Sequence, residues 1–340
     1  MRVLYIGNKL KKHGYTPTSV ETLGEDLKQY FNVKQVSDQK IYIFRLLDML
    51  VNILVSRKTV VLIDVYSTLS FHYAWISSIF CRLLNLPYIC IIHGGDFPKR
   101  ILKSKFLVNK FLFKYAYKII APSNYLKSNI EAITNYKIQL IPNSIDLEKY
   151  SFKQRSKLKI KLLWVRSFHK IYNPNLALDV LEELHKQGFR NGVLCMVGPK
   201  KDNSLVEFKK LVIEKRLEKF VTITGKLEKE KWLKLSEKFD FFLNTTNVDN
   251  TPVSVIEAMA LGLNVISTNV GGIPFMLNNN IDSVLVKPNS SKGFVKNIIE
   301  LVQTPKKAEL LRTNAREKVK NWDKKVIIKK WKKIICDTDN

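Results

Sequence analysis

The chain has 340 residues, of which 46% are hydrophobic, and its 57 lysine and arginine residues against 30 aspartate and glutamate residues give a formal net charge of +27. This length and hydrophobic content exclude a disordered or fibrous protein and favour two domains over one. The excess of cations predicts attraction to polyanions, whether nucleic acid, acidic lipid surfaces or phosphorylated substrates.

Strand and helix patterns alternate from the first residues onward, which is typical of parallel sheets covered on both faces. In the first half the expected order is strand 2–7, helix 21–31, strand 60–67, helix 71–86, strand 88–95, and strand-to-loop units at 117–123 and 137–146. The polar stretch 147–159 has no strong periodicity, so we place a domain boundary within it.

The alternation restarts after this boundary. The expected order is strand 161–168, helix 174–188, strand 192–198, helix 204–217, strand 220–225, helix 229–239, strand 240–246 and helix 252–261. Two such halves predict an α/β protein with two doubly wound, parallel-sheet domains, 1–150 and 151–320, which face one another across a cleft. In open sheets of this kind, ligands bind at the carboxyl ends of the strands.

No segment has the features of a signal peptide or a membrane span. The chain begins with a strand-like segment, and no run of about eighteen uncharged apolar residues occurs. The nearest run, from Ile41 to Val55, is interrupted by Arg45 and Asp48. The cysteines have no paired metal-type spacing and are Cys81, Cys90, Cys195 and Cys336. We therefore expect a cytoplasmic protein with reduced thiols.

Two basic tracts are prominent in the sequence. Residues 99–118 place lysines between apolar residues, as in a helix that lies on an anionic membrane. A surface helix with an ordinary buried stripe explains this tract equally well. Residues 318–335 have the same character, and there the alternative is packing against another domain by Trp322, Val326, Ile327 and Trp331.

The segment from Asp249 to Gly262 places two carboxylates, Asp249 and Glu257, on either side of a helix start. Thr251 suits the N-cap, Pro252 the first helical position and Gly262 the end of the helix. A helix N-terminus favours phosphate groups, and a buried carboxylate can accept hydrogen bonds from sugar or ribose hydroxyls. Together these features predict a nucleotide-sugar site. The spacing alone also fits a Glu257 that merely favours the helix.

Residues 249–274 resemble the donor-binding signature of the retaining glycosyltransferases of family four, the glycosyl transferases of group 1, which have the GT-B fold. The signature pairs two acidic residues eight apart with an Ala-Met-Ala-x-Gly helix end, an apolar strand and a Gly-Gly turn. Four further segments resemble motifs of the family in the expected order: IIHGG, IAPSNYLK, IPNSIDLEKY and CMVGPKKD. The resemblance implies two facing Rossmann-like domains, with a C-terminal helix, 321–340, that returns to the first domain.

By this resemblance Glu257 binds the ribose hydroxyls and Asp249 the transferred sugar, although the family more often has Glu at the first position. Other implied donor-binding groups are Gly198 and the backbone amides of Asn250, Thr251, Val253 and Ser254. Arg166 and Lys170 are implied to neutralise the leaving diphosphate; they are four positions apart, whereas the corresponding pair in the family is usually five apart. Taken alone, Arg166 also fits a surface ion pair.

In the first domain, His93 corresponds to a family histidine that reaches across the cleft toward the sugar. The alternative is a core or helix-capping histidine whose hydrogen bonds are made within the protein. The resemblance assigns Gly14 and Asp96 to acceptor binding, and Asp96 also fits a turn. The adjacent glycine pair that the family usually has is missing between Gly7 and Gly14.

The resemblance implies transfer with retention of anomeric configuration, by same-face attack in which the departing phosphate helps to take the acceptor's proton. It implies no metal and no other cofactor, since Arg166, Lys170 and the helix end supply positive charge. The Asp-x-Asp formed by Asp337 and Asp339 is interpreted as a solubilising terminus.

We therefore predict a peripheral enzyme on the inner face of a membrane, which moves a hexose from a nucleotide sugar to a lipid-linked saccharide during surface polysaccharide synthesis. Epimerases and phosphorylases share the GT-B fold and stay open as alternatives. A basic nucleic-acid-binding protein is less favoured, because the sequence has no helix-turn-helix, zinc or RNA-binding signature. The nucleotide base, the sugar, the acceptor and the oligomeric state are not indicated.

Overall fold

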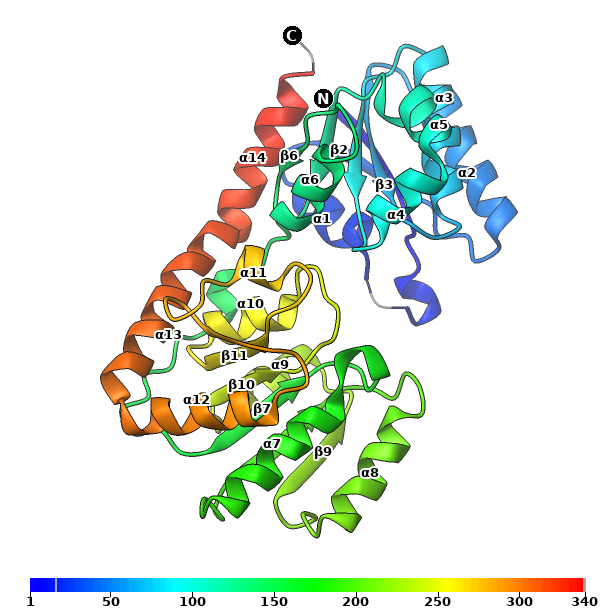
Figure 1. The fold of residues 1–340 in the computed structure, drawn as a ribbon. Coiled ribbons are helices and arrows are strands. Elements are labelled where there is room, and N and C mark those ends of the chain that lie inside the picture. Colours follow the sequence, from blue (N-terminus) through cyan, green and yellow to red (C-terminus); the bar gives the residue numbers. More distant parts are fainter. Residues whose placement is uncertain (16, 339–340) are drawn as a thin grey trace. The chain divides into compact units, whose positions relative to one another are not determined.

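Two parallel β-sheets organise the chain in this computed structural model, which describes residues 1–15 and 17–338 (Figure 1). Each sheet has six strands in the described residues and belongs to its own compact unit. Unit 1 contains Met1–Asn143 and the chain from Lys325 onward, and unit 2 contains Ser144–Lys324. The prediction of two Rossmann-like, parallel-sheet domains is confirmed.

Unit 1 has the strand order β2-β1-β3-β4-β5-β6. Its elements are β1 (Arg2–Ile6), η1 (Lys11–His13), α1 (Ser19–Leu27), β2 (Asn32–Val36), α2 (Tyr42–Leu54), β3 (Thr59–Val65), α3 (Phe71–Leu83), β4 (Tyr88–Ile92), α4 (Phe97–Lys103), α5 (Lys105–Leu107), η2 (Val108–Phe113), β5 (Lys118–Ala121), α6 (Asn124–Glu131), β6 (Gln139–Leu140) and α14 (Lys324–Cys336). Every residue of β3 and β4 is buried, because helices cover both faces of the sheet.

Unit 2 has the strand order β12-β11-β10-β7-β8-β9. Its elements are η3 (Leu147–Lys149), β7 (Lys161–Val165), η4 (Lys170–Tyr172), α7 (Pro174–Lys186), β8 (Val193–Val197), α8 (Ser204–Glu214), β9 (Val221–Gly225), α9 (Lys229–Ser236), β10 (Phe241–Asn244), α10 (Val253–Ala260), β11 (Asn264–Thr268), α11 (Ile273–Met276), β12 (Val284–Val286), α12 (Ser291–Gln303), α13 (Pro305–Val319) and η5 (Lys320–Trp322). The strands and helices expected from the sequence are all present, whereas β2 and α2 are not predicted by the pattern.

Helix α14 returns to unit 1, as predicted. Its buried stripe joins strand residues such as Tyr5 and Leu62 in one apolar cluster and consists of Ile327, Ile328, Trp331, Ile334 and Ile335. The packing interpretation of the tail therefore holds for Ile327 and Trp331. Val326 is exposed, and Trp322 packs on the core of unit 2 instead.

The basic tract 99–118 is not a single helix. It is divided among α4, α5 and η2, and its buried side chains include Ile101, Leu112 and Phe113. Leu102 and Phe106 are exposed between lysines. Ile101, Leu112 and Phe113 are therefore ordinary core residues, whereas Leu102 and Phe106 are not.

The units divide after Asn143, whereas the sequence places the first boundary after residue 150. Ile145 and Tyr150 explain the difference, because both are buried in the core of unit 2. The two points at which the chain passes from one unit to the other are linked by backbone hydrogen bonds. The N–H of Ile145 donates to the carbonyl oxygen of Trp322 at 3.0 Å, and the carbonyl oxygen of Ile145 accepts the N–H of Lys324 at 2.8 Å. The second crossing follows Lys324, where the sequence places it after residue 320.

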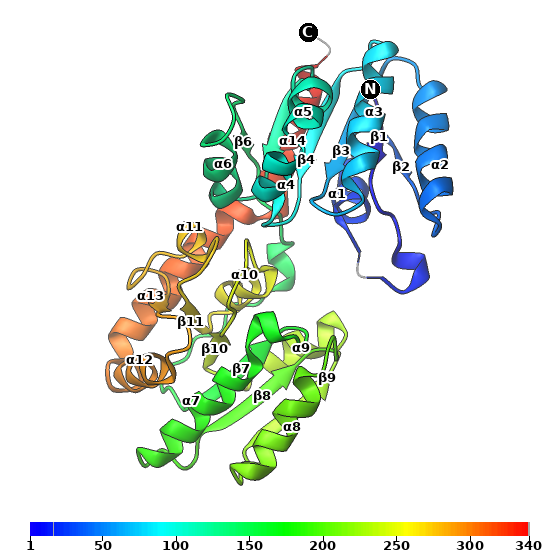
Figure 2. The same cartoon turned by 45° about the vertical axis from the view of Figure 1, so that its right-hand side comes forward.

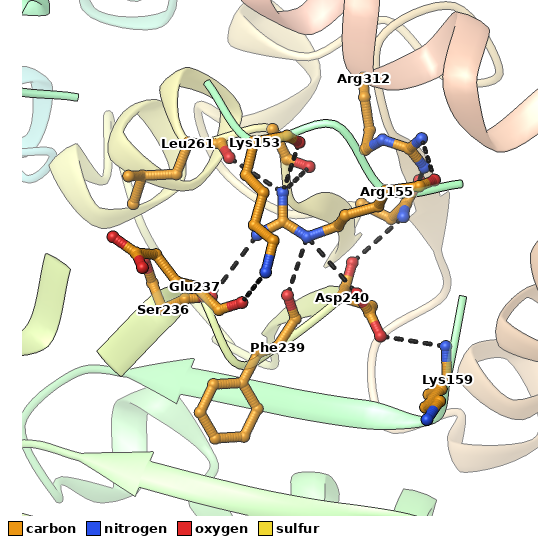
Figure 3. Close-up of polar contacts among 11 residues, drawn as sticks. Lys153, Arg155, Lys159, Ser236, Glu237, Phe239, Asp240, Leu261 and Arg312 are labelled. Carbon is orange, nitrogen blue, oxygen red and sulfur yellow. Dashed lines mark hydrogen bonds and ion pairs between the residues drawn. The ribbon is translucent and has the colours of Figure 1, made fainter. Parts of the chain in front are cut away.

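Arg155 anchors the stretch 147–159 in unit 2 (Figure 3). Its Nη1 donates to the carbonyl oxygens of Leu261 and Gly262 at 3.0 and 2.7 Å, at the end of α10. Its Nε donates to the carbonyl oxygen of Phe239 at 2.9 Å, just after α9. The last carbonyls of a helix have no partner within it and carry partial negative charge. One buried cation therefore stabilises the ends of two helices.

We expect Arg155→Met to lower the free energy of unfolding by about 3 kcal/mol, because the variant removes a buried charged donor from three carbonyl oxygens. Chemical denaturation followed by circular dichroism measures the change. The control is Lys157→Met, an exposed position in the same stretch, where we expect a change of at most about 0.5 kcal/mol. Equal losses in the two variants would contradict the anchoring role.

Candidate active site

The loop between β10 and α10 carries the predicted donor-binding signature. Helix α10 begins at Val253, one residue later than predicted, and Pro252 occupies the N-cap position with an extended ψ of 113°. Thr251, predicted as the N-cap, makes no capping hydrogen bond. The amides of Val253 and Ser254 thus lie in the first turn, where N–H groups have no acceptor within the helix.

The Gly-Gly turn of the signature packs directly on this loop. The N–H of Gly272 donates to the carbonyl oxygen of Asp249 at 2.8 Å. A Cβ atom on Gly271 would lie 2.2 Å from that oxygen, and one on Gly272 would lie 2.0 Å from the carbonyl oxygen of Asn250. Both positions therefore require glycine, and the turn fixes the backbone that carries Asp249.

Arg166 and Asp249, which were predicted separately, form an ion pair. Arg166 follows β7, and its guanidinium carbon lies 4.4 Å from the ring centre of Tyr172. Burial lowers the pKa of Arg166, and the nearby Tyr172 opposes that shift. Oδ1 of Asp249 also accepts the N–H of Asn250 at 2.8 Å, so this predicted donor-binding amide orients the carboxylate. The pair is partly buried, unlike an ordinary surface ion pair.

Several buried polar atoms near this pair lack partners. Within the described part of the chain, no hydrogen-bond partner is found for Nε of Arg166, Oγ1 of Thr251 or Oγ of Ser254. Buried polar atoms in proteins are nearly always hydrogen-bonded, so a group of exceptions requires an explanation. A bound ligand with acceptor and donor oxygens would satisfy all three.

Glu257 is buried on α10 and has two partners that the sequence does not predict. Its Oε1 accepts the hydroxyl of Tyr150 at 2.9 Å and forms an ion pair with Lys229 at the start of α9. Burial raises the pKa of Tyr150 and lowers the pKa of Lys229 to about 8. Tyr150 is the last residue of the motif IPNSIDLEKY, and its place in that motif was the sequence signal that could have revealed its role. Glu257 is therefore held in place rather than simply favouring the helix.

A cavity of about 260 Å³ lies at the carboxyl ends of β7, β8 and β9, where open sheets bind ligands. Its lining includes Arg166, Tyr172, Gly198, Lys226, Trp232 and Ser254. A Cβ atom on Gly198 would lie 1.7 Å from the carbonyl oxygen of Arg166, so only glycine fits there.

Lys170, the predicted partner of Arg166, is exposed on η4. It is not one of the described residues that line this cavity. Lys226 lines the cavity instead and was not predicted. It directly follows β9, and a lysine at a strand end was the only sequence signal for it.

In unit 1, His93 lies at the end of β4 beside the buried Asp64. Nε2 of His93 lies 2.7 Å from Oδ1 of Asp64, which also accepts the hydroxyl of Tyr5 at 3.0 Å. The ring of His93 stacks on Tyr66, with 4.9 Å between the ring centres. The carboxylate thus fixes the orientation of the imidazole, as expected for a histidine with a positioned second nitrogen. The lone acid in the apolar strand VVLIDV was the signal for Asp64.

The two predicted acceptor-binding residues lie in exposed turns. Gly14 ends η1 with a φ of 84°, a conformation that favours glycine. Asp96 precedes α4, and its carboxylate pairs with Lys99 at 2.9 Å. The turn interpretation of Asp96 therefore accounts for its position, and its contact with an acceptor stays a prediction.

Among residues 1–15 and 17–338, no three histidine, cysteine, aspartate or glutamate side chains gather in a way that could hold a metal ion. The predicted solubilising pair cannot be placed as a whole, because Asp339 lies outside the described residues. A metal-independent reaction stays a prediction.

Comparison with known proteins gives two family matches that together span most of the chain. The profile of Glycosyltransferase Family 4 matches residues 1–149, and that of Glycosyl transferases group 1 matches residues 146–318. The chain is 26% identical over 276 residues to an uncharacterized glycosyltransferase of Methanocaldococcus jannaschii, covering 74% of this chain and 69% of that protein. It is 24% identical over 281 residues to the UDP-Gal:alpha-D-GlcNAc-diphosphoundecaprenol alpha-1,3-galactosyltransferase of Escherichia coli, covering 76% and 71%.

Solved structures share the fold at low sequence identity. The Anabaena protein HepE in complex with UDP has a TM-score of 0.80 at 14% identity, with coverage of 99% of this chain and 100% of HepE. The sucrose-phosphate synthase of Thermosynechococcus elongatus has a TM-score of 0.77 at 15% identity, with 99% coverage of both chains. The group 1 profile spans half of the sequence and includes β7, α10 and the Gly-Gly turn that build the site described above. This chain therefore belongs to the glycosyltransferases of group 1.

Proposed function

We propose that this enzyme transfers a hexosyl group from a uridine diphosphate sugar to a lipid-linked saccharide, with retention of anomeric configuration. The observation that carries the proposal is the Arg166–Asp249 pair, with unpartnered buried polar atoms around it, beside the first turn of α10. The E. coli relative is named for a UDP-sugar donor and a diphosphoundecaprenol-linked acceptor, and HepE was crystallised with UDP. These names support the choice of donor and acceptor class.

The diphosphate lies in the cavity of unit 2 in this proposal. The free amides of Val253 and Ser254 donate to its oxygens, and Arg166 and Lys226 meet the charge that grows as the anomeric bond breaks. Asp249, oriented by Arg166, accepts hydrogen bonds from the sugar's hydroxyls. These fixed charges are already in place, so we propose a reaction that needs no metal ion.

The carboxylate of Glu257 accepts hydrogen bonds from the ribose hydroxyls. Tyr150 and Lys229 both contact Oε1, which leaves Oε2 for the nucleotide. The acceptor hydroxyl attacks the anomeric carbon on the face from which the diphosphate leaves, and its proton passes to the departing phosphate oxygen. The new bond then has the configuration of the old one, and no side-chain base is consumed.

Retention and group transfer distinguish this proposal from its alternatives. A GT-B epimerase would return a nucleotide sugar, and a phosphorylase would need inorganic phosphate. Incubation of a labelled UDP-hexose with a lipid-linked acceptor, followed by NMR of the glycolipid, separates these reactions. An inverted anomeric centre, or label found only in nucleotide sugar or free sugar, would refute the proposal.

We expect UDP, but not uridine, to raise the melting temperature of the wild-type protein, because the phosphates make most of the proposed contacts. Arg166→Met should weaken UDP binding by about 2 kcal/mol, roughly thirtyfold, through loss of charged hydrogen bonds. Lys226→Met should weaken it more than Lys170→Met, since only Lys226 lines the cavity. Isothermal titration measures each affinity. Lys209→Met on α8 is an exposed control that should bind like the wild type.

Glu257→Gln should abolish discrimination between UDP and 2′-deoxy-UDP, because the carboxylate is the proposed acceptor of the ribose hydroxyls. The wild type should prefer UDP by about tenfold. Isothermal titration with both nucleotides gives the two ratios. A Glu257→Gln variant that keeps the wild-type preference, with an unchanged circular dichroism spectrum, shows that ribose is recognised elsewhere.

Asp64→Asn should lower kcat/KM for transfer by about tenfold or more while leaving UDP affinity unchanged, because Asp64 acts through the orientation of His93. His93→Ala should have a similar effect, and the double variant should be no worse than the more damaged single variant, since the two residues act as one unit. Additive losses in steady-state kinetics would show that Asp64 has an independent role.

A further inference from the structure

Helix α2 differs from an ordinary surface helix because its exposed side is apolar as well as its buried side, which includes Met49 and Ile53. Its polar residues Arg45 and Asn52 face the interior and are 8% and 7% exposed. Its outward side chains are apolar, with exposed fractions from 47% to 65%: Ile43, Phe44, Leu47, Val51 and Leu54. With Val55, which directly follows the helix and is also exposed, these residues form what we call the α2 outer face. A surface helix normally presents charged and polar side chains to water instead.

The polar side chains of α2 that face inward make hydrogen bonds there. Arg45 donates to the carbonyl oxygens of Gln39 and Lys40, each at 2.7 Å, and to Oδ1 of Asn8 at 3.0 Å. Asp48 accepts the hydroxyl of Ser37 and an amide hydrogen of Asn52. These bonds fix the rotation of α2 about its axis, so its apolar residues are directed outward by the fold.

Neighbouring elements of unit 1 also have exposed apolar side chains. Helix α2 packs on α3 (Figure 2), and α3 packs on η2. Leu83 at the end of α3 and Phe106 on α5 are strongly exposed. Nζ of Lys110 lies 5.0 Å from the ring centre of Phe106, which places a cation next to this apolar side chain.

The charges around the α2 outer face have one sign. Lys40 precedes the helix, and Arg57 and Lys58 follow it, all three being exposed. Acidic residues between Lys40 and Lys118 are few in the sequence and are Asp48, Asp64 and Asp96. The first two face the interior in the contacts given above, and Asp96 is paired with Lys99. The result is an apolar surface with cations at its edge.

We propose that the α2 outer face docks this enzyme on an anionic membrane, with the helix lying in the plane of the interface. Its apolar side chains then enter the boundary between headgroups and acyl chains, about 5–10 Å deep, while Lys40, Arg57 and Lys58 meet lipid phosphates. The helix has 13 residues and is about 20 Å long, so it lies on the bilayer and cannot cross it. No helix in the described part of the chain is long and apolar enough to do so.

A second copy of the chain is a poorer occupant of this face. A two-fold contact through α2 would bring the same surface of both subunits together, and the cations at its edge would face cations. The net charge of +27 adds to that repulsion. An anionic bilayer instead complements both the apolar residues and their charged border. The proposal does not depend on which nucleotide sugar the enzyme uses.

Vesicle flotation tests this proposal with two double variants of the full chain. The wild type should bind vesicles of equal parts phosphatidylglycerol and phosphatidylcholine and bind phosphatidylcholine vesicles weakly. Leu47→Gln with Val51→Gln should reduce binding to the anionic vesicles at least about tenfold. The matched control is Val206→Gln with Ile213→Gln, which replaces exposed apolar residues on α8 and should bind like the wild type.

Circular dichroism spectra of all three proteins show that each is folded, and stabilisation by UDP, measured separately, distinguishes failure of this proposal from failure of the donor site. The proposal fails if the wild type does not float with anionic vesicles, if the α2 variant binds as well as the wild type, or if the α8 control is equally impaired. It also fails if the wild type is a dimer in size-exclusion chromatography that the α2 variant converts to a monomer. Displacement of the wild type from vesicles by salt, with no effect of the α2 variant, would assign binding to the basic tracts alone.

Discussion

A single buried guanidinium, that of Arg155, fixes the ends of the two helices that bring Lys229 and Glu257 together. Helix α9 begins at Lys229, α10 carries Glu257, and the carbonyl groups at or just beyond both C-termini accept hydrogen bonds from Arg155. A helix of two turns is stiff, so fixing one end orients the other. The Gly271–Gly272 turn fixes the preceding loop from the other side. The candidate donor site is therefore assembled by backbone packing before a ligand arrives.

Both sheets could be predicted because their strands are buried on two faces and read as apolar runs. The edge strand β2 has the exposed residues Asn32 and Lys34, so it lacks such a run. Helix α2 escapes prediction for a different reason. Its apolar residues lie on both sides of the helix, because Met49 and Ile53 are buried beside Arg45 and Asn52, so the periodicity does not reveal which side faces the sheet.

The candidate site was predictable only as separate pieces. Arg166 and Asp249 each have a sequence signal, whereas their contact depends on how β7 and the loop after β10 lie in the folded sheet. Lys170 is close to Arg166 along the chain but is exposed, and Lys226 is distant in sequence but lines the same cavity. Spacing along a chain reports distances only within one helix or strand.

Unit 1 is discontinuous in the sequence, because its sheet is covered on one face by α14, which follows unit 2. Unit 2 is continuous from Ser144 to Lys324 and can close its core as soon as it is synthesised. During translation the strands of unit 1 emerge first, yet Tyr5 and Leu62 wait for Trp331 before they lose contact with water. The strands of unit 1 thus precede unit 2 in the chain but complete their core after it, and until α14 packs on them their apolar surface is open to aggregation.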